Sequence, residues 1–150
     1  MAEIRNFHDF ESFKACRAFV KAIGVTLRKP KFNSDRILAA QMQRACISVL
    51  SNFAEGFERE GNIEFIQFLS VSKGSVGELR AQLIYSLDLG LLDDRPFNEL
   101  DALGESATRL LGGLIRYLSK SEKRGRKYDT RKRKVGIKKR TGKSRRAIAA

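Results

Sequence analysis

The sequence predicts an all-α protein, an up-down-up-down antiparallel four-helix bundle with a disordered basic C-terminal tail. Four segments of the 150-residue chain carry apolar residues at spacings of three and four, which is the helical period. No segment alternates apolar and polar residues as a half-buried strand does. Four helices of about 18 to 27 residues with short connections are typical of such a bundle.

The first helix follows a short N-terminal lead that contains Phe7 and Phe10. Its apolar stripe consists of Phe13, Cys16, Val20, Ile23 and Leu27. Pro30 ends this helix, because proline lacks the backbone N–H that a helix interior requires.

The second helix begins near residue 35 and continues to about Phe57. Asn33 or Ser34 offers an N-cap, and Asp35 is favourably placed in the first turn, where a negative charge complements the helix dipole.

The third and fourth helices are separated by strong turn signals. We expect the third helix to begin after Gly61 and to end before Gly90, a C-cap candidate. Asp93 and Asp94 then precede Pro96, which is tolerated in a first helical turn, so the fourth helix begins there and its stripe ends near residue 118.

Small residues interrupt the middle of the third helix. Gly74 and Gly77 each cost up to about 1 kcal/mol relative to alanine in a helix. We therefore expect a compensating close approach of helices, either within the bundle or between subunits. A nucleotide-binding loop is disfavoured, because no strand precedes these glycines.

The charge divides the chain into a bundle, residues 1–120, and a tail, residues 121–150. Of the overall net charge of +13, the tail holds 14 basic against two acidic residues, so the body is nearly neutral at +1. Like-charge repulsion and the few apolar residues predict a tail that is disordered when free. Its basic residues, the candidate nucleic-acid-binding set, are Lys123, Arg124, Arg126, Lys127, Arg131, Lys132, Arg133, Lys134, Lys138, Lys139, Arg140, Lys143, Arg145 and Arg146.

Several functional classes lack support in the sequence. His8 is the only histidine, and Cys16 and Cys46 show no metal-ligand spacing, so we expect no catalytic residue, no metal site and no cofactor. Both cysteines are interpreted as buried free thiols of a cytoplasmic protein. No stretch is long and apolar enough to suggest a signal peptide or a membrane span, so we expect no membrane partner.

The run SNFAEGFERE, continued by EFIQFLSVSKGSVGELRAQL, resembles the signature of the 23S rRNA intervening-sequence proteins, a family of bacterial four-helix bundles. The likeness extends to FHDFESFKA and LDLGLLDD and covers about residues 7–120. The sequence departs from the family pattern in two places. Leu50 stands where the family commonly has proline, and residues 58–60 stand where it usually has a more basic run. The positions that match the motif are Ser51, Asn52, Ala54, Glu55, Gly56, Phe57, Glu64, Phe65, Ile66, Phe68, Leu69, Gly74, Ser75, Glu78 and Leu79.

The resemblance implies a cytoplasmic homopentamer without assigned catalytic activity. Members of the family are often encoded within insertions in large-subunit ribosomal RNA genes. A related bundle, the accessory variability protein of diversity-generating retroelements, is similarly pentameric and resembles a partner for a reverse transcriptase and its template RNA. Both relationships point toward RNA or a ribosomal component as a partner.

The polar residues of the motif allow two interpretations. Asn52, Glu55 and Glu64 could form a polar site that orients a partner group or holds a cation. Alternatively, Asn52 bonds neighbouring backbone and Glu55 accepts from the free amides at the start of the third helix, and we favour this structural role.

Two hypotheses for function follow from the sequence. The first is a non-enzymatic RNA-binding homopentamer whose tail contacts phosphates, with RNA favoured over DNA by the resemblance alone, because both polymers carry the same phosphate charge. The second is an adaptor that docks a protein partner such as a retroelement reverse transcriptase, with the tail in an assisting role.

Overall fold

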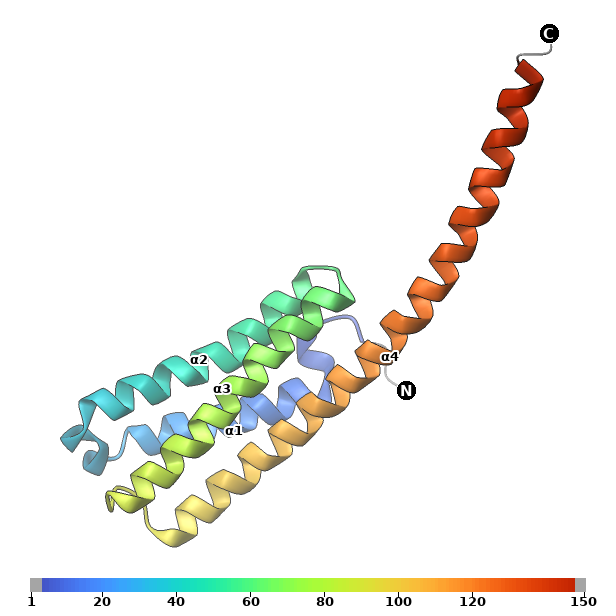
Figure 1. The fold of residues 1–150 in the computed structure, drawn as a ribbon. Coiled ribbons are helices and arrows are strands. Elements are labelled where there is room, and N and C mark those ends of the chain that lie inside the picture. The colour runs from blue at the N-terminus through green and yellow to red at the C-terminus, as the bar shows by residue number, and fades with distance from the viewer. Residues whose placement is uncertain (1–3, 148–150) are drawn as a thin grey trace.

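The computed structural model describes residues 4–147, with side chains described through residue 121. The elements are the 3-10 helix η1 (Phe7–Asp9), α1 (Glu11–Leu27), the 3-10 helix η2 (Pro30–Ser34), α2 (Arg36–Glu58), α3 (Asn62–Asp88) and α4 (Asp94–Ala147). Figure 1 shows α1 to α4 side by side, and α1 and α3 each contact both α2 and α4. Over residues 4–147 there is no strand. This arrangement confirms the predicted all-α four-helix bundle.

The start of α2 differs from the prediction by one or two residues. Asp35 is the N-cap, and its Oδ1 accepts a hydrogen bond from the Leu38 N–H at 2.9 Å. Asn33 and Ser34 lie instead in η2, which begins at Pro30. This extra 3-10 turn buries Phe32 under the bundle, so the α-helix begins only after it.

The end of α3 is a Schellman motif, in which a left-handed residue terminates the helix. Gly90 has φ +72°, its N–H donates to Leu87 O at 2.9 Å, and the Leu91 N–H donates to Ser86 O at 2.9 Å. Glycine adopts this conformation without a Cβ penalty, so the predicted C-cap at Gly90 is confirmed.

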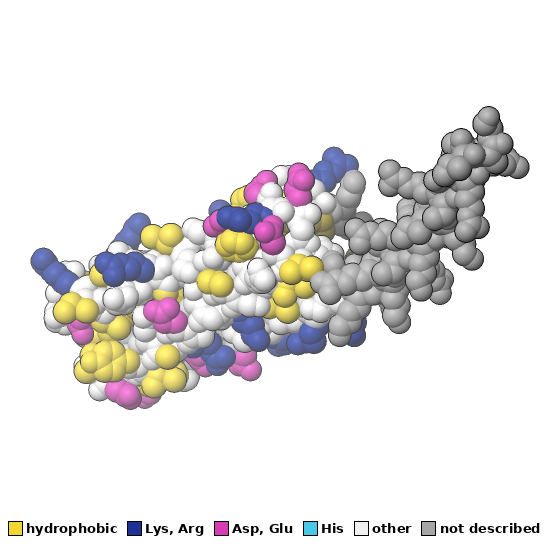
Figure 2. Space-filling model, turned by 45° about the horizontal axis from the view of Figure 1, so that its top comes forward, with side chains coloured by type: hydrophobic (Ala, Val, Ile, Leu, Met, Phe, Trp, Pro, Cys, Tyr) yellow, Lys and Arg dark blue, Asp and Glu magenta, His cyan; other side chains and the backbone are white. Residues whose placement is uncertain are grey.

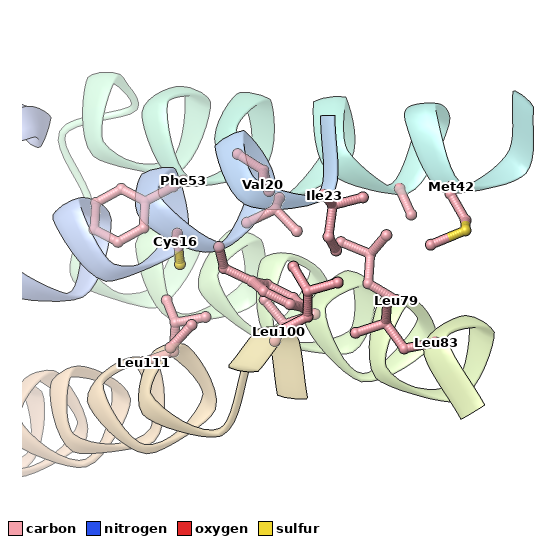
Figure 3. Packing of buried hydrophobic residues seen from close by; sticks show 14 of the residues in the cluster. Cys16, Val20, Ile23, Met42, Phe53, Leu79, Leu83, Leu100 and Leu111 are labelled. Carbon is pink, nitrogen blue, oxygen red and sulfur yellow. The ribbon is translucent and has the colours of Figure 1, made fainter. Parts of the chain in front are cut away.

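The core is a continuous column of apolar side chains contributed by all four helices. Figure 3 shows Ile23 of α1 beside Leu79 of α3, and Cys16 and Phe53 of α1 and α2 farther along the core, across from Leu111 of α4. At the end near residue 10, edge-to-face phenylalanine rings fill the space between α2 and α3. Close packing of this kind makes the body a rigid support for its surface residues.

The helix α4 continues beyond the bundle. Up to residue 121, where the described side chains end, its last buried residue is Leu118, and Figure 1 shows its backbone leaving the other helices and extending to residue 147. A helical segment without packing partners is marginally stable in water. The disorder of residues 121–150 in the free protein and the boundary at residue 120 remain predictions, because the side chains beyond residue 121 lie outside the described part of the chain.

Candidate nucleic-acid interface

Asn52 and its neighbours form a polar seam between α2 and α3. The Asn52 Nδ2 donates to the Ser48 carbonyl at 2.9 Å and to the Ser48 Oγ at 3.0 Å. The Ser48 Oγ lies 2.8 Å from the Ser75 Oγ across the seam, and the Ser72 Oγ donates to the Val49 carbonyl at 2.7 Å. These bonds satisfy polar groups at a helix contact, which is the condition for burying them.

The sequence predicts that Glu55 accepts hydrogen bonds from the backbone amides at the start of α3, and this prediction is wrong. Its Oε1 instead pairs with Arg59 Nη2 at 2.7 Å, four residues along the same helix and about half exposed. Arg59 also lies over the Phe68 ring, with its guanidinium carbon 4.9 Å from the ring centroid. The expected link between the two helices at this end is therefore made by Arg59.

The remaining polar residues of the motif do not converge on a site. Ser51 and Glu64 are exposed, and Glu78 Oε1 accepts from Gln82 Nε2 at 3.2 Å on the surface of α3. Among the side chains through residue 121, no group of three His, Cys, Asp or Glu is placed to hold a metal ion. His8 packs edge-on against Phe7 in the N-terminal lead.

Gly56 is a position of close approach between α2 and α3. A Cβ added there would lie 2.5 Å from the Phe68 Cβ and 3.1 Å from the Phe65 ring. The Phe68 Cβ is fixed to the α3 backbone and cannot rotate away. The motif glycine therefore permits the helix contact, and Phe65 and the half-buried Phe68 pack directly over it.

We expect Gly56→Ala to lower the free energy of unfolding by about 1–3 kcal/mol, because overpacking outweighs the gain in helix propensity. Gly74→Ala is the matched control, since nothing lies within 4 Å of a Cβ at Gly74 and only the propensity gain of up to about 1 kcal/mol applies. The melting temperature should therefore fall for Gly56→Ala and rise for Gly74→Ala. A shift of the same sign for both variants would contradict this packing.

The glycines predicted to allow a close approach lie on the outside of α3. Apart from adjacent residues and the backbone of α3 itself, no described atom lies within 4 Å of a Cβ at Gly74 or Gly77, so the interpretation of a close approach within the bundle is wrong for both. The same helix exposes Val71, Ile84 and Tyr85, each about half accessible. Figure 2 shows hydrophobic side chains gathered toward the end of the body away from the grey residues. The close approach between subunits remains a prediction.

The contact between α3 and α4 is held by an ion pair and a second glycine. Arg80 donates from Nε to Asp101 Oδ1 at 2.7 Å and from Nη2 to Oδ2 at 3.1 Å. A Cβ at Gly104 would lie 2.9 Å from both the Phe19 ring and the Arg80 side chain. This bidentate pair fixes the lateral position of α4, the helix that carries the basic tail.

The two thiols are free, as expected; Cys16 is buried, whereas Cys46, which was also expected to be buried, is only partly buried. Burial raises the pKa of the Cys16 thiol to about 12 and that of the Cys46 thiol to about 11. Since only the thiolate is nucleophilic, neither group is an activated nucleophile.

Alkylation by iodoacetamide at pH 7.4 should accordingly be slow in the native protein and fast in urea. A pKa of about 12 for Cys16 instead of the ordinary 9.0 lowers its thiolate fraction about 1,000-fold. Mass spectrometry of the labelled chain measures both rates. Equal labelling in the presence and absence of urea would contradict the burial of the thiols.

Two shallow hollows mark the surface of the body. One, of about 470 Å³, lies between α1 and α4 and is lined mainly by apolar side chains such as Ala22, Val25 and Leu103. The other, of about 260 Å³, lies at the Phe10 end beside Phe57. Lys21, Lys29 and Glu99 also line the larger hollow.

The charged candidate residues all lie on the extension of α4. The 14 Lys and Arg of the tail follow residue 121, so their side chains lie outside the described part of the chain. The near-neutral body, however, is electrically uneven. Residues 12–34 hold six Lys or Arg and no Asp or Glu, whereas residues 55–108 hold eleven acidic and four basic residues. The net charge of the body, +1, conceals this segregation because the basic and acidic segments cancel each other.

Fold and surface together define a small four-helix bundle with a cationic C-terminal extension. The sequence profile of the 23S rRNA-intervening sequence protein family matches residues 8–113, and the chain belongs to this family.

A solved structure supports the fold. The chain is similar to a protein of unknown function from the S23 ribosomal protein family of Bacteroides thetaiotaomicron VPI-5482, with a TM-score of 0.64 and 13% sequence identity. The match covers 70% of this chain and 95% of that one. No curated protein matches the sequence. In the described residues, no helix is long and apolar enough to cross a membrane.

Proposed function

We propose that this protein is a non-enzymatic, cytoplasmic, homo-oligomeric nucleic-acid-binding protein whose tail contacts the phosphates of RNA. The observation that carries the proposal is the concentration of 14 of the 30 basic residues in the last 30 positions, attached to a rigid bundle. Lys and Arg that neutralise phosphates release condensed counterions, which gives strong binding at low salt. RNA is favoured over DNA because of the family to which the chain belongs.

The proposed oligomer is a pentamer, as the family resemblance implies. Five tails on one assembly raise the effective concentration of each further contact, so avidity exceeds the affinity of one tail by about 100-fold or more. Native mass spectrometry should give about 85 kDa, five times the chain mass of 16.9 kDa. A monomer mass at micromolar concentration would contradict the pentamer.

The experiment that tests nucleic-acid binding compares three polymers at low salt with the full-length protein. Fluorescence anisotropy should show tight binding to a structured RNA and to a DNA duplex of equal length, and none to neutral dextran. Binding to the RNA no stronger than to dextran would overturn the proposed function.

An adaptor is the second candidate, favoured by the exposed apolar face of α3. Val71, Ile84 and Tyr85 surround the open glycines and offer a surface for a protein partner such as a reverse transcriptase. The discriminating test is copurification of a coexpressed retroelement reverse transcriptase with residues 1–120 alone. Retention by these residues, lost in Tyr85→Glu, would favour the adaptor over direct RNA binding.

A further inference from the structure

A straight row of basic residues follows the outer side of α1. Lys14, Arg17, Lys21 and Arg28 are all exposed, and their spacings of three, four and seven place them on one side of the helix. The buried residues of α1, such as Cys16 and Ile23, face the opposite way into the core. At 1.5 Å per residue the row is about 21 Å long. We call these four residues the α1 row.

The charges of the α1 row are largely unneutralised. Only Lys14 has an ion pair, with Glu11 at 2.6 Å, and the side chains of the other three make no ion pair or hydrogen bond with the described residues. Three arginines elsewhere in the body, Arg59, Arg80 and Arg95, each pair with a carboxylate.

This arrangement has an energetic penalty for the folded helix. Arg17 and Lys21 are like charges four residues apart on one side of the helix, an arrangement that destabilises a helix. No acidic residue occurs between positions 12 and 34, and the one carboxylate that lines the same hollow as Lys21, Glu99 of α4, forms its ion pair with Arg95. An anionic ligand on the row would remove the penalty.

We propose that the α1 row is a second phosphate-binding surface, which contacts the backbone of a double-helical segment of the bound nucleic acid. This inference rests on the proposed function and adds a site on the folded body to it. The row is held on a packed helix, so its charges have fixed spacing and match a rigid ladder of phosphates without further ordering. A flexible single strand loses conformational entropy when it is ordered along the same row. Its net binding free energy on the row is therefore less favourable than that of a duplex.

Two full-length variants with equal net charge test the inference. Arg17→Gln/Lys21→Gln/Arg28→Gln removes three charges from the row, and Lys138→Gln/Lys139→Gln/Arg140→Gln removes three from the tail. Each is titrated with salt on a 20-base-pair RNA duplex and on an unstructured single strand of equal length. The charge-retaining variant Arg17→Lys/Lys21→Arg/Arg28→Lys controls for effects unrelated to charge.

The row variant should reduce the log–log salt slope on the duplex by about 2 to 3, at about 0.9 per lost contact, and by less than about 1 on the single strand. The tail variant should reduce both slopes similarly, and the charge-retaining variant should match the wild type. A row variant that binds the duplex like the wild type, while the tail variant is weakened, overturns this inference and leaves the proposed function intact. Loss of binding to phosphatidylserine vesicles with unchanged duplex binding also overturns it, in favour of a lipid surface. Failure of the wild type to bind either RNA refutes the proposed function itself.

Discussion

Replacing Phe53 with alanine is expected to lower the free energy of unfolding by about 3–5 kcal/mol. The Phe53 side chain is fully buried, and its ring packs edge-on against Phe10, Phe13 and Phe65 at centroid distances of 5.6, 5.2 and 5.7 Å. These rings join the N-cap and first turn of α1, and the start of α3, to α2, so the truncation leaves a cavity that no single neighbour can fill. Urea denaturation followed by circular dichroism measures the loss.

Tyr117→Ala is the control for this prediction. Tyr117 is 70% exposed on α4, and its truncation should change the free energy of unfolding by no more than about 0.5 kcal/mol. If the two variants unfolded at the same urea concentration, the phenylalanine cluster would not be the core that the structure describes.

Deleting residues 121–150 is expected to weaken binding to a structured RNA at least about 100-fold at 50 mM salt. The deletion removes 14 of the 30 basic residues. For comparison, a protein with six to ten phosphate contacts loses a factor of about 10³–10⁵ in affinity when salt rises from about 50 to about 200 mM, although all its contacts are still present. Fluorescence anisotropy with full-length and shortened protein measures the difference.

The same deletion should leave the stability of the body nearly unchanged. All buried hydrophobic residues of the described part lie at or before Leu118, so the shortened chain retains its core. A melting temperature within about 2 °C of the full-length value is the expected control result. Unchanged RNA affinity would instead mean that the body alone carries the binding.

The helix boundaries were predictable wherever one residue type has a unique local role. Gly90 ends α3 because only glycine adopts its positive φ freely, and this holds regardless of tertiary packing. The start of α2 was harder to predict, because η2 depends on Phe32 being buried under the bundle. The sequence pattern shows the candidate cap residues of α2, but it does not show the burial of Phe32 that moves the N-cap to Asp35.

The roles of individual glycines could not be predicted from the sequence. Gly56 and Gly74 both interrupt helical patterns, yet one lies against the Phe68 Cβ and the other faces open space. The difference depends on which side of each helix meets a neighbour at close range. The pair of Glu55 with Arg59, by contrast, follows the spacing of four residues that joins opposite charges on a helix surface, and it could have been predicted from the sequence.

The basic side of α1 could not be identified from the sequence for a different reason. Six basic residues without an acidic one in residues 12–34 were visible in the sequence, but a net charge for the whole body averages them with the acidic segment that follows. Only the placement of Arg17, Lys21 and Arg28 on one exposed side of a packed helix makes them a surface.

The central claim is that the basic tail binds nucleic-acid phosphates, and the salt dependence of RNA binding by the full-length protein tests it most directly. The account predicts that log affinity falls against log salt with a slope steeper than about −4, corresponding to about five phosphate contacts, and that residues 1–120 show a much shallower slope. A full-length slope near zero, or equal slopes for the two proteins, would contradict the claim.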